Sequence, residues 1–363
     1  MTSEDARAIA CTSSALEFPL FCDLGLRYAL LKSYTIDNVG KLLHAASDLV
    51  DPQQAAKRYE DTEVIYTFLG GHFPLSSPSL HKAVARMNYL HAPYIKSGKI
   101  LNADLLYVLY LSMAEPVRFV NLYEWRCLTD MEVASHAALW KTVGSMMGIN
   151  FSKELGKSEW KDGLEFMDDM TRWGVRYEDL HMHPLPEIQR LGAILVDMLL
   201  SAYPAMMRPL VYQMLHVILG DTMRHVLGLP EPGIAVSAFT YTLLLCRRLF
   251  LRYLTLPRIS PVWIVSGPDP TTGKLHHNRY LKEPWYVPAT AWTRWDLQAW
   301  MTRACGGMLP GDGGPRMKPD GFLFDDIGPL NRIGRGAAEM ARIEEVVRGE
   351  AARKYPFAAC KKL

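Results

Sequence analysis

The chain has 363 residues, with 40 Lys and Arg against 38 Asp and Glu, and a formal net charge of +2 at pH 7. This balance lacks the basic field of nucleic-acid-binding proteins, so we expect no nucleic-acid partner. Six scattered cysteines without C-x-x-C or zinc-site spacing indicate a reducing, intracellular compartment. The opening twenty residues are too polar for a signal peptide or a membrane span, which predicts a chain without a transmembrane anchor.

Helical periodicity dominates the sequence, and linker-like stretches are few. We therefore predict an all-α fold, a multi-helix orthogonal bundle that forms one domain over residues 1–363. Its parts are an N-terminal arm (1–34), a helical core (35–256) and a Pro/Gly-rich C-terminal extension (257–363) packed on the core.

A helix over residues 35–50 is followed by one that carries two polar residues in an apolar stripe. This second helix is predicted to start at Asp51-Pro52, an N-cap followed by proline at the first helical position, and to stop at Gly70-Gly71. Arg58 and Thr62 are four residues apart, so they share one face of the helix. The residues that share this face are Ala55, Arg58, Thr62, Ile65 and Leu69.

The next helix places a histidine in its apolar stripe. It is predicted to start at Ser77-Pro78 and to stop near Ser97-Gly98. Its inward stripe comprises Leu80, Val84, Met87, His91 and Tyr94. A buried neutral imidazole can ligate a metal, whereas a buried arginine is costly without an acidic partner. Polar residues on two neighbouring stripes therefore predict a lined pocket.

Later helices are more apolar. One starts at Asn102 and is expected to bend or end at Pro116, and a capping box at Thr129 and Glu132 starts another that runs to Gly148. The apolar runs at 191–203 and 234–246 are interpreted as buried core helices, with peripheral membrane contact as the alternative.

Sequence segments spread over most of the chain resemble one protein family. In chain order they are KRYEDT (57–62), RMNYLH (86–91), GKILNAD (98–104), EPVRF (115–119), EWR (124–126), LTDME (128–132), WKTVG (140–144), HNRY (277–280), PWYV (284–287), RW (294–295), LPGDG (309–313) and IGP (327–329). The sequence resembles the family that joins fungal MpaB-type oxygenases to bacterial rubber oxygenase, the latex-clearing protein. It is most similar to the fungal branch.

The resemblance implies a globin-reminiscent helical core that holds haem b, with His91 as the iron ligand. The R-x-x-x-T pair of the family corresponds to Arg58 and Thr62, which would face the distal side of the haem. Arg86 is a candidate by residue type for pairing with the haem propionates. Rubber oxygenase has a lysine just before the threonine, whereas this chain has Asp61. We therefore expect no lysine-capped resting state, and Asp61 either pairs with Lys57 or faces solvent.

Each site residue also has a plain structural interpretation. His91 could be a hydrogen-bonded core residue, Arg58 could pair with a carboxylate such as Glu60, and Thr62 could bond to its own helix backbone. The other histidines are rivals for the iron: His44, His72, His81, His136, His181, His183, His216 and His225.

The functional expectation is a haem-b-dependent oxygenase that uses O₂ to cleave a C=C bond in a hydrophobic secondary metabolite, a terpenoid or prenylated polyketide. Its catalytic residues would be Arg58 and Thr62. The first alternative is a haem-dependent dehydratase, isomerase or cyclase, and the second is a non-catalytic protein that binds an apolar ligand. We expect an intracellular protein, soluble or peripherally attached to a membrane.

Overall fold

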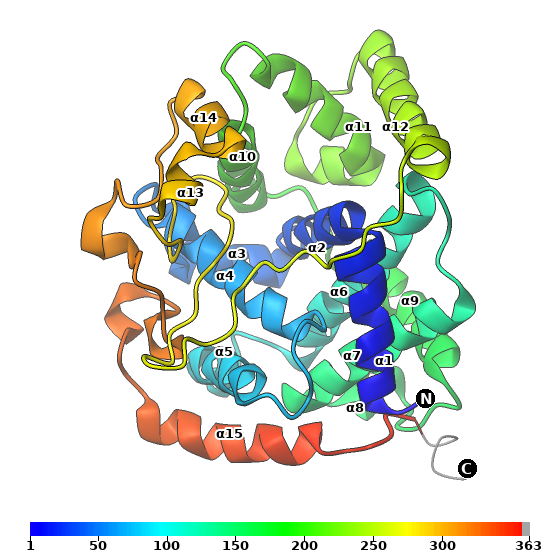
Figure 1. Ribbon diagram of the computed structural model, residues 1–363. Helices are drawn as coiled ribbons and strands as arrows, with labels where there is room; N and C mark the ends of the chain where they lie inside the picture. The colour runs from blue at the N-terminus through cyan, green and yellow to red at the C-terminus, as the bar shows by residue number, and fades with distance from the viewer. Residues whose placement is uncertain (358–363) are drawn as a thin grey trace.

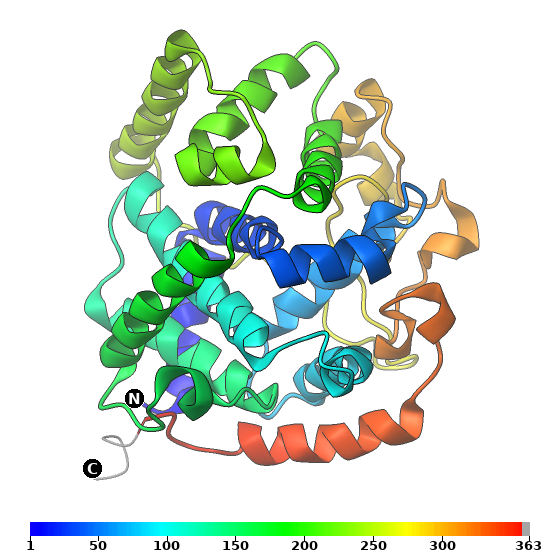
Figure 2. The ribbon, with the colours of Figure 1, turned by 180° about the vertical axis from the view of Figure 1, so that it is seen from behind.

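The computed structural model describes residues 1–357 as a body of fifteen α-helices, which contains isolated β-bridges but no β-strand in that range (Figures 1 and 2). This confirms the predicted all-α fold. The helices are α1 (Ser3–Cys11), α2 (Pro19–Ser33), α3 (Asp37–Ala46), α4 (Ala55–Leu69), α5 (Pro78–Lys96), α6 (Asn102–Tyr123), α7 (Asp130–Met146), α8 (Phe151–Leu155), α9 (Gly163–His181), α10 (Pro186–Ser201), α11 (Arg208–Leu227), α12 (Ile234–Leu254), α13 (Ala291–Trp295), α14 (Leu297–Ala304) and α15 (Ala337–Ala351).

Helix α6 lies in the middle of the body with α2 packed along it. The sequence predicted that the helix would bend or end at Pro116, and α6 does not end there, because it continues to Tyr123. A Cβ added at Gly25 of α2 would lie 2.6 Å from the Cα of Pro116, so the two backbones touch here. We attribute the tolerated proline to this close packing, which offsets the ~3 kcal/mol cost of a proline inside a helix.

The predicted N-terminal arm is instead two core helices. Helix α1 packs against α7, and Phe21 and Cys22 of α2 are buried. The buried guanidinium of Arg7 donates to the carbonyl oxygen of Phe68 at 2.6 Å and also to that of Phe73. Residues 1–34 therefore help to build the core, which their polar opening did not reveal.

The helix boundaries near the predicted pocket mostly agree with the sequence signals. Helix α5 begins at the expected Pro78, and the capping box of Thr129 and Glu132 starts α7. Helix α4 begins at Ala55, later than predicted, because the Asp51 carboxylate accepts a hydrogen bond from the backbone N–H of Gln53 in a preceding turn.

Helix α12 is not the buried core helix that we predicted. Of its 21 residues only Thr240 is buried. By length and composition alone, α6 and α12 are long and apolar enough to cross a membrane, as is the bent pair Ser3–Glu17 with Pro19–Ser33 if it counts as one span. Helix α6 is mostly buried within the protein, whereas α12 lies on the outside of the body, at the same end as α10, α11, α13 and α14.

The C-terminal extension is anchored to α4 through a buried ion pair. Lys57 Nζ lies 2.7 Å from Asp61 Oδ2, and both side chains are almost fully buried. The Asp61 carboxylate also accepts hydrogen bonds from the Tyr286 hydroxyl at 2.7 Å and from the Gly328 backbone N–H at 2.9 Å. Of the two sequence-based alternatives for Asp61, pairing with Lys57 is therefore confirmed.

Replacing Asp61 by alanine is expected to destabilise the protein by about 3–5 kcal/mol, because it leaves the Lys57 ammonium buried without its counter-charge. Chemical denaturation would measure this loss. The matched control is Asp221→Ala, since Asp221 is exposed and pairs with Arg224 at 2.5 Å, and we expect a change within about 1 kcal/mol there. Equal effects of the two substitutions would contradict the anchoring role.

Candidate active site

A cavity of about 560 Å³ lies among the ends of α2 and α7, helices α3 to α6 and the segment 327–332. Arg58 and Thr62 enter its lining from α4, and His91 enters from α5. The structure thus brings together the residues singled out on two neighbouring helical stripes. Most of the remaining wall is apolar: it includes Leu42, Leu43, Ile65, Leu69, Met87, Leu90, Leu105, Val108 and Leu109.

Arg58 and Thr62 bond to each other along α4. The Arg58 guanidinium donates through Nη1 to the Thr62 hydroxyl, and that hydroxyl donates to the Arg58 carbonyl oxygen at 2.9 Å. Thr62 therefore does bond to its own helix backbone. Arg58 has no carboxylate partner among the described residues, so the proposed pairing with Glu60 is not formed. Its remaining N–H groups are left for a ligand in the cavity.

His91 is the only histidine among the described residues that line this cavity. Its ring makes no hydrogen bond or ion pair with another described residue. Burial, with a smaller effect of the nearby Arg58 charge, lowers the pKa of His91 from 6.5 to about 4. The imidazole is therefore neutral at pH 7 and has a lone pair available for a metal.

Several rival histidines have other partners. The ring of His81 lies 2.6 Å from the Leu75 carbonyl oxygen, and that of His136 lies 3.2 Å from the Ser13 hydroxyl. His181 lies 3.3 Å from the carboxylate of Asp37. This supports the choice of His91, which the resemblance implies and which the helical stripe places toward the core.

Two tyrosines of the cavity were missed at the sequence level. Tyr66 lies four residues after Thr62, so the periodicity that selected Arg58 and Thr62 could have found it. Its hydroxyl lies 3.3 Å from that of Ser112 on α6. Tyr34, at the end of α2, also lines the cavity, and burial raises the pKa of its hydroxyl to about 12. Both phenols are therefore neutral hydrogen-bond donors at pH 7.

Arg86 does not line the cavity, which corrects the expectation that it contacts the cofactor. The side chain is fully buried, and its guanidinium donates to backbone carbonyls of the C-terminal extension. These acceptors are Ile327 at 2.8 Å, Arg335 at 3.0 Å, Asp325 at 3.0 Å and Arg332 at 2.9 Å. Arg86 is thus committed to holding the segment that closes the cavity.

Arg332 is better placed than Arg86 to pair with a haem propionate, because it lines the cavity and has no carboxylate partner among the described residues. Its guanidinium lies 3.5 Å from the Tyr89 hydroxyl. The chain position of Arg332, far from the pocket helices, gave no signal for this role.

We expect Arg86→Met to lower the free energy of unfolding by about 3 kcal/mol or more, since buried carbonyls lose their donor. Arg332→Met should leave the free energy of unfolding almost unchanged and should weaken the binding of an anionic cofactor. Denaturation curves and hemin titrations of the two variants separate these outcomes. Weaker hemin binding by a stable, folded Arg86→Met protein would restore Arg86 as a cofactor contact.

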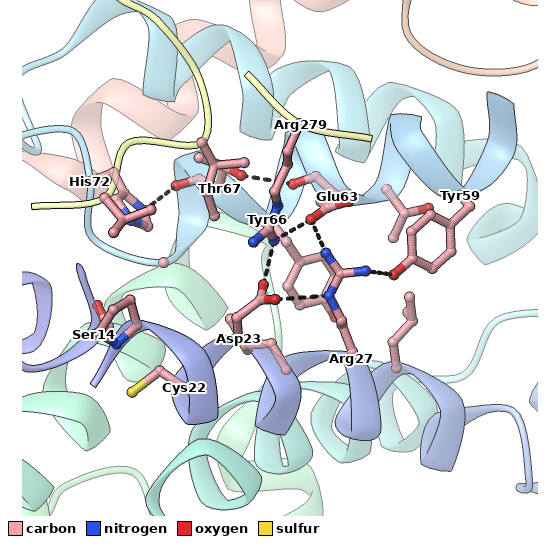
Figure 3. Close-up of a pocket in the computed structure, with 17 residues that line it drawn as sticks. Ser14, Cys22, Asp23, Arg27, Tyr59, Glu63, Tyr66, Thr67, His72 and Arg279 are labelled. Atoms are coloured by element: carbon pink, nitrogen blue, oxygen red, sulfur yellow. Dashed lines mark hydrogen bonds and ion pairs between the residues drawn. The ribbon is translucent and has the colours of Figure 1, made fainter. Parts of the chain in front are cut away.

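A second, smaller cavity of about 90 Å³ is bordered by a cluster of charged side chains (Figure 3). Arg27 and Arg279 converge there on the carboxylates of Asp23 and Glu63, and Arg27 also donates to the Tyr59 hydroxyl. Leu30, Thr62 and Tyr66 line both cavities. These three side chains therefore form the wall between the two cavities.

Glu60, Glu63 and His277 form a rival metal-binding cluster. One potential ligand atom from each lies within 4.8 Å of the other two. His277 is fully buried, and its Nδ1 lies 3.2 Å from Oε2 of the buried Glu60. The second carboxylate oxygen of Glu60 accepts a hydrogen bond from the backbone N–H of Leu281 at 2.8 Å.

Charge balance favours a structural role for this cluster. Two guanidiniums, those of Arg27 and Arg279, already face Glu63. A divalent ion would add a second concentration of positive charge beside them, at a cost in electrostatic repulsion. We interpret the cluster as an ion-pair network that fixes α4 against residues 277–281.

A haem needs a neutral nitrogen ligand, apolar walls and cations for its propionates. The apolar cavity supplies the unbonded imidazole of His91, and it supplies Arg58 and Arg332 as cations without carboxylate partners among the described residues. Its volume lies within the roughly 300–1,000 Å³ range of cofactor pockets. The residues present therefore fit this group.

Comparison with known proteins assigns the family. Residues 39–249 match the family described as "ER-bound oxygenase mpaB/B'/Rubber oxygenase, catalytic domain". The match spans more than half of the chain and includes Arg58, Thr62 and His91. The chain belongs to this family.

Three fungal proteins are similar to this chain, two of them over nearly its whole length. The protein is 32% identical to "ER-bound oxygenase mpaB'" of Penicillium brevicompactum, over 98% of this chain and 85% of that one. It is 33% identical to "ER-bound oxygenase mpaB" of the same fungus, over 90% of this chain and 78% of that one. The mpaB of Penicillium roqueforti is 32% identical over 62% of this chain and 75% of that one. The chain is therefore an enzyme of the oxygenase class.

Proposed function

We propose that this family member is a haem-b-dependent oxygenase that cleaves a C=C bond of a hydrophobic small molecule. The observation that carries the proposal is one mainly apolar cavity lined by the unbonded imidazole of His91 and by the Arg58–Thr62 pair. The apolar wall suits a prenyl or terpenoid chain, because such a chain gains free energy when it leaves water.

In this proposal each residue has a distinct task. Bound haem would supply the iron centre for reaction with dioxygen. His91 would hold the haem iron through the lone pair of its neutral imidazole. The guanidinium of Arg58 is held in place by Thr62 and would donate hydrogen bonds to the negative charge that develops on oxygen. Stabilisation of developing charge is usually the largest single contribution to catalysis. Tyr34 and Tyr66 would offer neutral hydroxyl donors at the same wall.

Turnover of an apolar polyene with and without O₂ tests the reaction class. The oxygenase proposal predicts carbonyl products that carry ¹⁸O when the reaction is run under ¹⁸O₂. Turnover by the haem-loaded protein under nitrogen would instead support the dehydratase, isomerase or cyclase alternative. A haem-free protein that only binds the polyene would support the non-catalytic alternative.

Retention of haem should depend on pH in a way that reflects the lowered pKa of His91. As pH falls, a proton competes with iron for the imidazole, and this competition starts only near the pKa of about 4 instead of 6.5. We therefore expect the Soret band to be constant from neutral pH down to about 5. Loss of the Soret band with a midpoint near pH 6.5, while the far-UV circular dichroism spectrum stays native, would contradict a lowered pKa of His91.

The enzyme's location is proposed from its relatives. The three similar fungal proteins carry the words "ER-bound" in their names. We propose that this chain also works at an intracellular membrane, where an apolar substrate would accumulate.

A further inference from the structure

We propose that α12 lies in the plane of a membrane surface and that a cavity beside the middle of this helix receives the phosphate of an anionic phospholipid. This inference deepens the membrane location proposed above by naming the surface and the lipid chemistry. It depends on no step of the oxygenase reaction, and its test uses no activity measurement.

Helix α12 exposes apolar side chains around most of its circumference. Phe250 is 53% exposed and Leu254 is 73% exposed. At about 100° per residue, the exposed apolar side chains cover an arc of roughly 220°. The members of this arc are Ile234, Phe239, Tyr241, Leu243, Leu245, Leu249, Phe250, Tyr253 and Leu254. Lipid can surround such an arc, whereas one protein partner would cover a narrower face.

Neighbouring segments extend the apolar surface at the same end of the molecule. Exposed Met206 precedes α11, and exposed Leu256 and Ile259 follow α12. Helices α13 and α14 add three exposed tryptophans, Trp292, Trp295 and Trp300. Figures 1 and 2 both place α11 to α14 at this end of the body. Tryptophan is the residue most typical of the boundary between lipid and water.

The charge of this segment complements an anionic lipid surface. Residues 233–268 contain four arginines and no acidic residue or lysine. Arg247 pairs with Glu124 at 2.9 Å, whereas Arg248, Arg252 and Arg258 make no ion pair with any residue in the described range 1–357. Because the whole chain is almost neutral, this is a local excess of positive charge. Each such arginine contributes about 1 kcal/mol of attraction to an anionic membrane.

A cavity of about 400 Å³ lies beside the middle of α12, where this helix faces α6 and α11. Arg118 of α6 and Arg248 of α12 enter it, beside apolar side chains such as Leu122 and Leu244. Arg118 is paired with Glu115 at 2.5 Å, whereas Arg248 makes no ion pair or hydrogen bond with any residue in the described range 1–357. A free guanidinium beside apolar walls fits a phosphate with the start of its acyl chains.

The chain on both sides of α12 returns to the same body, so α12 cannot cross a bilayer. Before it, the Leu219 carbonyl of α11 accepts a hydrogen bond from the Tyr28 hydroxyl of α2. After it, the Val262 backbone N–H donates to the carbonyl of Ala15 at 2.8 Å. A span would place these flanking segments on opposite sides of the membrane. The helix must therefore lie along the surface.

A second copy of the chain is the main competing occupant. In a two-fold dimer, the same patch meets itself. Pairing through α12 would bring Arg248, Arg252 and Arg258 of each copy together without an acidic residue of residues 233–268 to oppose them. Charge repulsion therefore favours the membrane over self-association.

Vesicle flotation of the full chain tests the proposal. We expect the wild type to bind phosphatidylcholine vesicles that contain phosphatidylserine more tightly than pure phosphatidylcholine vesicles. Phe250→Glu with Leu254→Glu should weaken binding at least about a hundredfold, because two large apolar side chains no longer enter lipid. Arg248→Gln should cost about fivefold on the anionic vesicles, and more than the matched Arg252→Gln, because Arg252 does not line the cavity.

The matched control is Val175→Glu with Leu180→Glu on α9, where both side chains are exposed apolar residues away from α12. This control should bind like the wild type. Equal loss in the control, or no vesicle binding by the wild type, overturns the docking surface. Losses of equal size in Arg248→Gln and Arg252→Gln overturn the phosphate site. A wild-type dimer that becomes a monomer in the α12 variant, without vesicle binding, assigns the surface to a second copy.

Labelling with a fluorescent dye gives a second test, which introduces no charged residue into α12. Cys246 on α12 and Cys127 are both exposed. Each can carry an environment-sensitive dye in a chain where the other cysteines are replaced. We expect a blue shift on anionic vesicles for the dye at Cys246 and none for the dye at Cys127. Equal responses of the two dyes would overturn the proposal.

Discussion

His91→Ala is expected to lose haem and oxygenase turnover together. The cavity has no other histidine among its described lining residues, so no described side chain can replace the imidazole. Free imidazole should enter the space left by the ring and restore part of the Soret band and of the turnover. Absorption spectra and product assays of the variant, with and without imidazole, measure both effects.

His136→Ala is the matched control for this substitution. Burial lowers the pKa of His136 to about 4, as it does for His91, but His136 lies outside the cavity and contacts Ser13. This control should lose stability and keep its haem. If His91→Ala retains a full Soret band, the assignment of the iron ligand is wrong.

Arg58→Leu is expected to lower kcat by about a hundredfold or more, the usual effect of removing a donor aimed at developing negative charge. Because Arg58 is one of the two cations that the cavity offers to the propionates, we expect some loss of haem, while His91 and Arg332 hold the rest. Steady-state turnover per bound haem isolates the effect from cofactor loss. An unchanged kcat would mean that Arg58 does not act on the reacting oxygen.

Thr62→Val should show a smaller loss in the same direction, since Thr62 steadies the guanidinium of Arg58. Thr67→Val is its control on the same helix: the Thr67 hydroxyl bonds to the Glu63 carbonyl in the same four-residue pattern, and Thr67 does not line the apolar cavity. A loss of equal size in Thr67→Val would indicate a general effect on α4 and not a role for Thr62 in the cavity.

The pocket was predictable because its main residues lie on local helical stripes. The four-residue spacing of Arg58 and Thr62 and the apolar neighbours of His91 determine which face of each helix they occupy. The same spacing extends to Tyr66, which could also have been found. Residue pattern within one helix thus carried most of the site.

Residues that act across long sequence separations were not predictable in this way. Arg86 has the charge that a propionate partner needs, but its actual acceptors are carbonyls about 240 residues further along the chain. The contact between Glu60 and His277 has the same origin. No local pattern indicates which distant backbone segment will pack on a given helix.

Helix α12 shows a different limit. Its apolar composition is that of a core helix, and hydropathy cannot distinguish burial in protein from burial in lipid. The decisive information is tertiary, because other helices fill the core and leave α12 outside.

The most direct test of the central claim is the visible spectrum of the purified protein, ferric and dithionite-reduced, during titration with hemin. We expect a Soret band that saturates at one haem b per chain and shifts on reduction. A protein that shows no Soret band and no saturable hemin binding would contradict a haem site at His91.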